Sequence, residues 1–165
     1  MDDRIGMLLR LLDEAFDRKS WHGTNLRGAL RGLSAREASW RPAPGRHNVW
    51  EIALHAAYWK YAVRRRLVGE KRGSFPLKGS NWFERPAAGT DRDGQWQADL
   101  TLLVGEHRAL RQVIAALRPQ RLSTRAPGGS TSVQALLTGI AAHDLYHAGQ
   151  IQLLKRLATS RSPGR

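Results

Sequence analysis

Apolar residues recur at spacings of three and four along four long stretches of the chain, which predicts four amphipathic helices. The first stretch is formed by Ile5, Leu8, Leu9, Leu12 and Phe16. Residues 20–23, SWHG, interrupt the pattern, and Thr24 is placed to cap a continuation. That continuation carries Leu26, Leu30 and Leu33. Residues 41–45, RPAPG, then end it in a loop.

The second predicted helix has clear signals at both ends. Asn48 is a typical N-cap residue, and Glu51 stands three residues later, at the position that a capping box requires. We expect Gly69 to end the helix. Three arginines, residues 64–66, fall in its last turns, where positive charge complements the helix dipole. The apolar face carries Ile52, His55, Ala56, Trp59 and Val63.

Two further helices are predicted in the second half of the chain. The third carries Trp96, Leu100, Leu103, His107, Leu110, Ile114 and Leu117 on one face. Residues 119–130 form a loop, after which Ser130 or Thr131 caps the fourth helix. The fourth carries Val133, Leu137, Ile140, His143, His147, Ile151 and Leu154. A long connection, residues 73–93, joins the second and third helices, and its aromatic residues indicate that it packs over another part of the molecule.

No segment shows the alternation of a β-strand, so the sequence predicts an all-α fold. Four long helices and one long connection indicate a four-helix bundle with a crossover between helices two and three. A length of 165 residues suits one domain, and we expect residues 1–165 to form a single helical bundle. Hydrophobic residues make up 41% of the chain and charged residues 25%, as in a globular protein rather than a disordered one.

The absence of cysteine excludes several kinds of chemistry. A disulfide scaffold, an iron–sulfur cluster, a thiolate zinc site and a cysteine nucleophile all need Cys, and the chain has none. Any metal must therefore be bound by His, Asp or Glu. No apolar run approaches the ~18 residues of a membrane span, and no secretory signal is visible. We expect a cytoplasmic protein that does not contact a membrane.

The chain is strongly basic, with 27 Lys plus Arg, 14 Asp plus Glu and a formal net charge of +13. Such a charge attracts polyanions. Only five of the basic residues are lysines, so the excess is mostly arginine, and the arginines are scattered along the chain. This pattern favours a compositional bias over nucleic-acid binding. A basic helical protein that binds metal or nucleic acid without catalysis is the alternative function.

Histidine is the most informative residue type in the chain. Four of the six histidines lie on apolar faces of predicted helices: His55, His107, His143 and His147. His143 and His147 are four residues apart, so both rings project from one face of a helix. Neutral imidazole is a common metal ligand, and a three-histidine site with His55 leaves positions open for water or substrate. The other interpretation is that each histidine is a hydrogen-bonded core residue.

Glu51 lies four residues before His55, which gives it two possible roles. It is either a base or a supporting residue at the metal, or it serves only the capping box. Two glycines inside the fourth helix also carry information, because glycine costs roughly 1 kcal/mol relative to alanine there. Gly139 and Gly149 indicate either close contact between helices or room for a substrate.

Three further residues are candidates for the lining of a pocket. Trp59 follows His55 by four residues, and the alternative for it is ordinary core packing. Trp82, together with Phe83, forms either a lid over the site or an anchor for the long connection. His107 lies on the inward face of the third helix, where it lines the pocket or bonds within the core.

Two segments of the chain carry a resemblance to a known family. They are residues 44–55, PGRHNVWEIALH, and residues 143–151, HDLYHAGQI. Residues 21–23, WHG, and 66–70, RLVGE, fit the same pattern. Together they resemble the DinB/YfiT-like superfamily over most of the chain. The resemblance implies a four-helix bundle, a homodimer and a divalent metal on His55, His143 and His147, with zinc or nickel favoured and manganese or iron as alternatives.

Members of that superfamily include low-molecular-weight-thiol S-transferases and a mycothiol-dependent isomerase, and many others are described as metal-dependent hydrolases. The resemblance therefore implies a divalent-metal-dependent hydrolase or thiol S-transferase that acts on a small molecule. A metal on three histidines lowers the pKa of a bound water or thiol, which makes a nucleophile near neutral pH. Because the chain has no cysteine, a thiol nucleophile would come from a cosubstrate.

Overall fold

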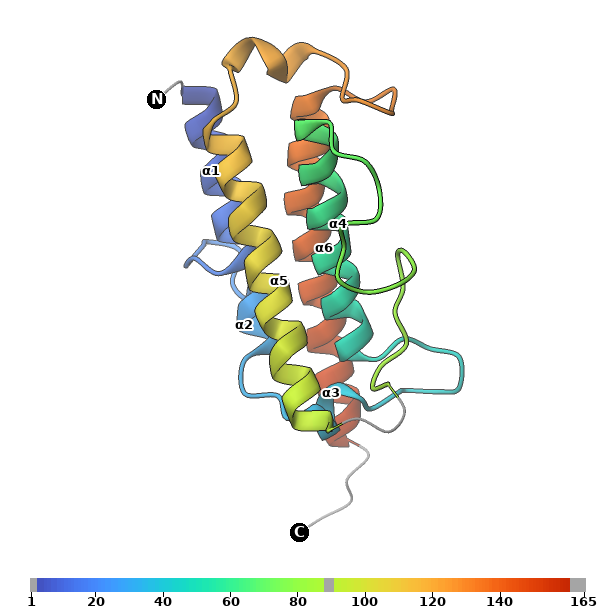
Figure 1. Cartoon of the computed structure of the whole chain (residues 1–165). Coiled ribbons are helices and arrows are strands. Elements are labelled where there is room, and N and C mark those ends of the chain that lie inside the picture. The colour runs from blue at the N-terminus through green and yellow to red at the C-terminus, as the bar shows by residue number, and fades with distance from the viewer. Residues whose placement is uncertain (1–2, 88–90, 161–165) are drawn as a thin grey trace.

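The computed structural model describes residues 3–87 and 91–160, and this part of the chain is helical apart from turns and loops. Four long helices lie side by side (Figure 1): α1 (Asp3–Phe16), α4 (Val49–Val68), α5 (Arg92–Ala115) and α6 (Val133–Ser160). Three short helices complete the fold: α2 (Leu26–Leu30), α3 (Ala35–Ala38) and the 3₁₀ helix η1 (Pro119–Ser123). The prediction of an all-α fold is confirmed.

The direction of the helices explains the long connection. Figure 1 shows that α4 and α5 run the same way, whereas α1 and α6 run the opposite way. The chain must therefore return along the bundle after α4 before α5 can begin. The described part of this return, residues 69–87, lies beside α4 (Figure 1). It is placed to contribute to any site between α4 and α6, which also pack against each other.

The ends of α4 are those that the sequence predicts. The side chain of Asn48 accepts a hydrogen bond from the backbone N–H of Glu51 at 2.8 Å, and the Glu51 carboxylate accepts one in return from the N–H of Asn48. Gly69 ends the helix with φ of 75°, a left-handed conformation that favours glycine. These two ends fix the register of α4, and with it the direction in which His55 projects.

The segment after α1 differs from the prediction. Thr24 does not cap it; the side chain of Asn25 accepts from the N–H of Gly28 at 2.9 Å and begins α2. The prediction that one helix continues from Leu26 to Leu33 is also wrong, because Gly32 has φ of +75° and turns the chain between α2 and α3. Ser34 then starts α3 with a capping box of its own.

The predicted boundaries of the later helices also need correction. Neither Ser130 nor Thr131 caps α6; the hydroxyl of Ser132 accepts from the N–H of Ala135 at 3.2 Å. The third predicted helix starts earlier than its apolar stripe, because Asp91 caps α5 through the N–H groups of Asp93 and Gly94. The helix ends at Ala115, before Leu117, because Pro119 disfavours a helical conformation in the residue that precedes it.

Two clusters of buried apolar side chains form the core along the bundle. A buried polar layer lies with them and includes Lys60 of α4, His107 of α5 and Asp144 of α6. Lys60 and Asp144 form an ion pair in which neither side chain is exposed. Buried charges are tolerated when they are paired, so this pair ties α4 to α6. Among the helices of the described residues, none is long and apolar enough to cross a membrane.

Candidate metal centre

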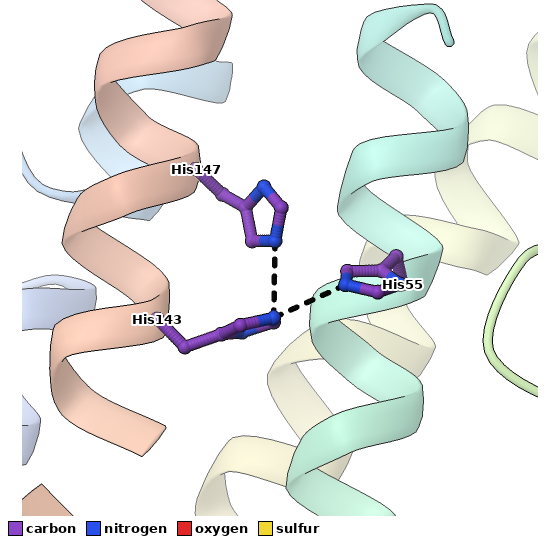
Figure 2. A group of neighbouring side chains, drawn as sticks. All are labelled: His55, His143 and His147. Carbon is purple, nitrogen blue, oxygen red and sulfur yellow. Dashed lines mark hydrogen bonds between the residues drawn. The ribbon is translucent and has the colours of Figure 1, made fainter. Parts of the chain in front are cut away.

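Three histidines from two helices converge in the groove between α4 and α6. Figure 2 shows His55 from α4 facing His143 and His147 from α6. The Nε2 atom of His143 lies 3.1 Å from Nε2 of His55 and 3.0 Å from Nε2 of His147. Each ring offers one nitrogen, and these three nitrogens lie within 4.8 Å of one another. The three residues predicted from helical spacing are thus brought together.

The orientation of His55 is held by the loop after α4. Its Nδ1–H donates to the backbone carbonyl of Asn81 at 2.9 Å, which leaves Nε2 free of the proton and directed at the other histidines. Asn81 has a left-handed φ of 67°, and its side-chain oxygen accepts from the indole N–H of Trp59 at 2.9 Å. A loop residue and a tryptophan on α4 therefore fix the position of one metal-ligand candidate.

The two histidines of α6 differ in their support. His147 donates from Nδ1 to the side-chain oxygen of Gln150, one helical turn away, at 2.7 Å. His143 has a buried Nδ1 without a hydrogen-bond partner among the described residues. Ligand histidines commonly donate their second nitrogen to an acceptor that sets the tautomer. His55 and His147 follow this pattern, so both present Nε2 as a lone-pair donor.

Aromatic side chains contact the three-histidine cluster, and the predicted role of Trp59 and Trp82 in lining a pocket stays a prediction. Trp82 stacks on His55 with ring centroids 3.9 Å apart and on His47 with centroids 3.6 Å apart. Trp59 meets His55 edge-on, with centroids 6.3 Å apart. Phe83 is buried among apolar side chains, 5.3 Å from the ring of Phe75, so it anchors the loop.

Burial controls the protonation of the cluster. It lowers the pKa of His55 to about 4 and the pKa of His143 to about 3, and it also lowers the pKa of His147. All three rings are therefore neutral near pH 7, which is the form that binds metal.

The donor set fits a divalent metal ion. Bonds of 2.0–2.1 Å in tetrahedral geometry place ligand nitrogens roughly 3.3 Å apart. The two separations that involve His143, 3.0 and 3.1 Å, are close to that value, and all three nitrogens lie within 4.8 Å of one another. Imidazole nitrogen suits zinc, nickel, copper and iron, and three such ligands leave further coordination positions open.

The sequence matches the DinB superfamily over residues 19–151, which is more than half of the chain. The chain belongs to the DinB superfamily. No curated protein and no solved structure matches it. The part of the chain that matches the DinB superfamily contains all three histidines of the cluster.

Glu51, the predicted catalytic candidate of this DinB-superfamily chain, faces other partners. Its carboxylate accepts from the guanidinium of Arg41, from Nδ1 of His47 at 3.0 Å and from the backbone N–H of Arg85 at 3.2 Å. Burial acts to raise the pKa of Glu51, but the hydrogen bonds from Arg41 and His47 outweigh it and hold the pKa below its ordinary value. The capping-box role is confirmed. A role as base at the metal stays a prediction.

His107 lies apart from the three-histidine group of the DinB-superfamily chain. Its ring stacks on Phe16 with centroids 3.8 Å apart, and its Nε2 is 3.9 Å from a carboxylate oxygen of Asp13. Both partners belong to α1, so His107 joins α5 to α1 across the buried polar layer. Burial lowers its pKa to about 3. Its predicted place in a pocket stays a prediction.

The sequence analysis missed the residues that orient the ligands. Gln150 follows His147 by three residues, and helical spacing is a signal that would have found it. Asn81 contributes a backbone carbonyl to His55, and a carbonyl carries no sequence signal. The pairing of Lys60 with Asp144 was also missed, because it depends on the relative position of α4 and α6.

Proposed function

We propose that the chain is a divalent-metal-dependent enzyme that activates a water or the thiol of a small cosubstrate, in hydrolysis or in thiol S-transfer. One observation carries the proposal: the Nε2 atoms of His55, His143 and His147 converge, with neighbouring pairs 3.0 and 3.1 Å apart. Zinc or nickel is the favoured ion, with manganese or iron as alternatives. When bound, the ion lowers the pKa of a coordinated water or thiol and so supplies a nucleophile near neutral pH.

The residues around the cluster position the ligands. Asn81 and Gln150 accept the Nδ1 protons of His55 and His147, so the nitrogens that face each other carry lone pairs. Trp82 covers His55 and is itself stacked on His47, whose Nδ1 lies 3.0 Å from the Glu51 carboxylate. In this proposal Glu51 is a positioning residue that acts through His47 and Trp82.

The hydrolase and transferase versions differ in the source of the nucleophile. The chain has no cysteine, so a thiol nucleophile comes from a thiol cosubstrate. A water nucleophile comes from solvent and needs no thiol cosubstrate. Cobalt(II)-loaded protein distinguishes them, because thiolate binding produces an intense charge-transfer band. The transferase version predicts this band with low-molecular-weight thiols and thiol consumption with an electrophilic substrate. The hydrolase version predicts ester or amide cleavage that continues without thiol. If metal-loaded protein showed neither activity, the proposal would be overturned.

The alternative of a basic protein without catalysis makes a different prediction. It requires duplex DNA binding that weakens steeply with salt, or a metal whose coordination admits no further ligand. Several arginines already pair with carboxylates, among them Arg64 with Glu106, Arg85 with Asp99 and Arg111 with Asp13. These pairs reduce the positive charge available to a polyanion.

We also propose that the chain acts as a cytoplasmic homodimer. Tyr146, Leu153 and Leu157 of α6 are 64%, 58% and 42% exposed, and their spacings of seven and four place them on one face of the helix. Exposed apolar side chains on one helix face are typical of contact between copies of a chain. Sedimentation equilibrium of the native protein and of Leu153→Glu tests it. A monomeric native protein would contradict the homodimer.

A further inference from the structure

A small apolar pocket lies beside His143, in the groove between α4 and α6. Its volume is about 190 Å³. The residues that line it include Trp59 and Val63 of α4 and Leu136, Gly139, Ile140 and His143 of α6. Among the described residues, no side chain that carries a formal charge at neutral pH lines it. The pocket is therefore suited to an apolar group rather than to an ion or a sugar.

The pocket continues from the candidate metal centre along the same groove. On α4, Trp59 follows His55 by one helical turn, and Val63 follows by two. On α6, Gly139 precedes His143 by one turn. His143 belongs both to the three-histidine cluster and to the pocket lining. Trp59, which also lines the pocket, has its ring 6.3 Å from the ring of His143. A molecule held at the cluster can thus extend one or two turns into the pocket.

Gly139 gives the pocket part of its space. An added Cβ at Gly139 would meet no heavy atom of the described residues within 4 Å, apart from its chain neighbours and its own helix backbone. Close contact between helices is therefore not the reason for this glycine. A glycine inside a helix costs roughly 1 kcal/mol relative to alanine, and here it leaves room next to His143.

We propose that the pocket binds a compact apolar group of the substrate, about the size of a benzene ring, next to the reacting atoms at the three-histidine cluster. An enclosed, engineered protein cavity of about 150 Å³ with apolar walls binds benzene; the pocket here has a volume of about 190 Å³ and is partly open, so a bound ring would keep part of its surface exposed. The substrate class is then an aryl or branched alkyl compound whose polar, reactive end reaches the cluster. The inference rests on the proposed function, whose nucleophile acts on that end.

The test compares two thiols, phenylmethanethiol and methanethiol, bound to cobalt(II)-loaded protein and followed through the thiolate charge-transfer band. The ratio of the affinity for phenylmethanethiol to the affinity for methanethiol is expected to be about tenfold higher in native protein than in Gly139→Leu, because the leucine fills the pocket. Gly149→Leu is the matched control. Gly149 is exposed on the same helix, has equal space for a Cβ and does not line the pocket. Comparing the ratio of the two affinities between variants removes the difference in intrinsic thiol basicity.

Fluorobenzene supplies a readout that does not depend on the metal. Its ¹⁹F line is expected to broaden with native protein and with Gly149→Leu, but not with Gly139→Leu, whether or not metal is bound. Fluorobenzene binding in a protein that takes up no metal would support the pocket and contradict the proposed function. Thiol binding with equal preference in native protein and Gly139→Leu, and no fluorobenzene binding, would overturn the pocket and leave the proposed function standing.

Discussion

Lys60 of α4 and Asp144 of α6 form an ion pair in which neither side chain exposes any surface to solvent. Lys60 lies five residues after His55, and Asp144 directly follows His143. The pair therefore connects the two helices that supply the three histidines, close to the point where the rings meet. Burial raises the pKa of Asp144 to about 6, while the charge of Lys60 opposes this shift.

Removal of one partner leaves the other charge buried. Lys60→Met is expected to lower the free energy of unfolding by about 3–5 kcal/mol, measured by urea denaturation at pH 7.5. The double variant Lys60→Met/Asp144→Leu should recover most of this loss. Arg27→Met is the control, because Arg27 pairs with Asp17 at 3.5 Å on the surface and its loss should cost about 1 kcal/mol or less. A Lys60→Met protein as stable as the native protein would contradict the account.

Trp82 should support metal binding through His55. Trp82→Ala removes the ring stacked on His55 and is expected to weaken zinc affinity about tenfold, measured by competition with a chromophoric chelator. Trp21 is the matched control, because its side chain is 99% exposed and Trp21→Ala should leave the affinity unchanged. Equal affinities in the two variants would show that the stacking does not support the metal centre.

The acceptor for His147 should matter in the same way. Gln150→Ala leaves the Nδ1–H of His147 without its acceptor, and zinc affinity should fall by about 10- to 100-fold. Gln150→Glu retains an acceptor oxygen and should bind zinc at least as tightly as the native protein. Gln134→Ala changes an exposed residue of the same helix and serves as control. The same chelator competition measures all three, and a native-like Gln150→Ala would refute the proposed role.

The buried histidines predict how stability depends on pH. The pKa of His107 is about 3 in the folded protein, whereas an unfolded histidine has a pKa near 6.5. Between these values the unfolded chain binds a proton that the native protein excludes, so stability falls as the pH falls from about 6.5 toward 3.

The variant His107→Leu isolates this contribution. In metal-free protein it should reduce the slope of unfolding free energy against pH by about 1.4 kcal/mol per pH unit between pH 5.5 and 4. Urea denaturation at several pH values measures the slope. His22→Ala replaces an exposed histidine and should leave it unchanged. An identical slope in His107→Leu and native protein would contradict this assignment.

The three metal-ligand candidates can be predicted from sequence because helical spacing is local. The four-residue interval between His143 and His147 puts both on one face, and the caps of α4 fix the register that turns His55 inward. Because the apolar face of each helix turns toward the core, His55 is brought toward His143 and His147. The all-α fold can likewise be predicted from local patterns, since four amphipathic stretches are enough to indicate it.

The remaining features depend on the path of loops and on how the helices pack. Asn81 reaches His55 only because the loop after α4 returns along the bundle with a left-handed φ at that residue. The helix after α1 breaks at Gly32, although its apolar spacing continues to Leu33. Asn25 rather than Thr24 caps α2, which shows that two adjacent capping residues cannot be separated by residue type alone.

The most direct test of the metal centre is metal stoichiometry in tag-free protein, measured by elemental analysis after equilibration with zinc or nickel and gel filtration. The account predicts about one equivalent in native protein and in His107→Leu, and loss of that equivalent in His55→Ala, His143→Ala and His147→Ala. A native protein that takes up neither ion, or three alanine variants that retain the full equivalent, would contradict the three-histidine metal centre.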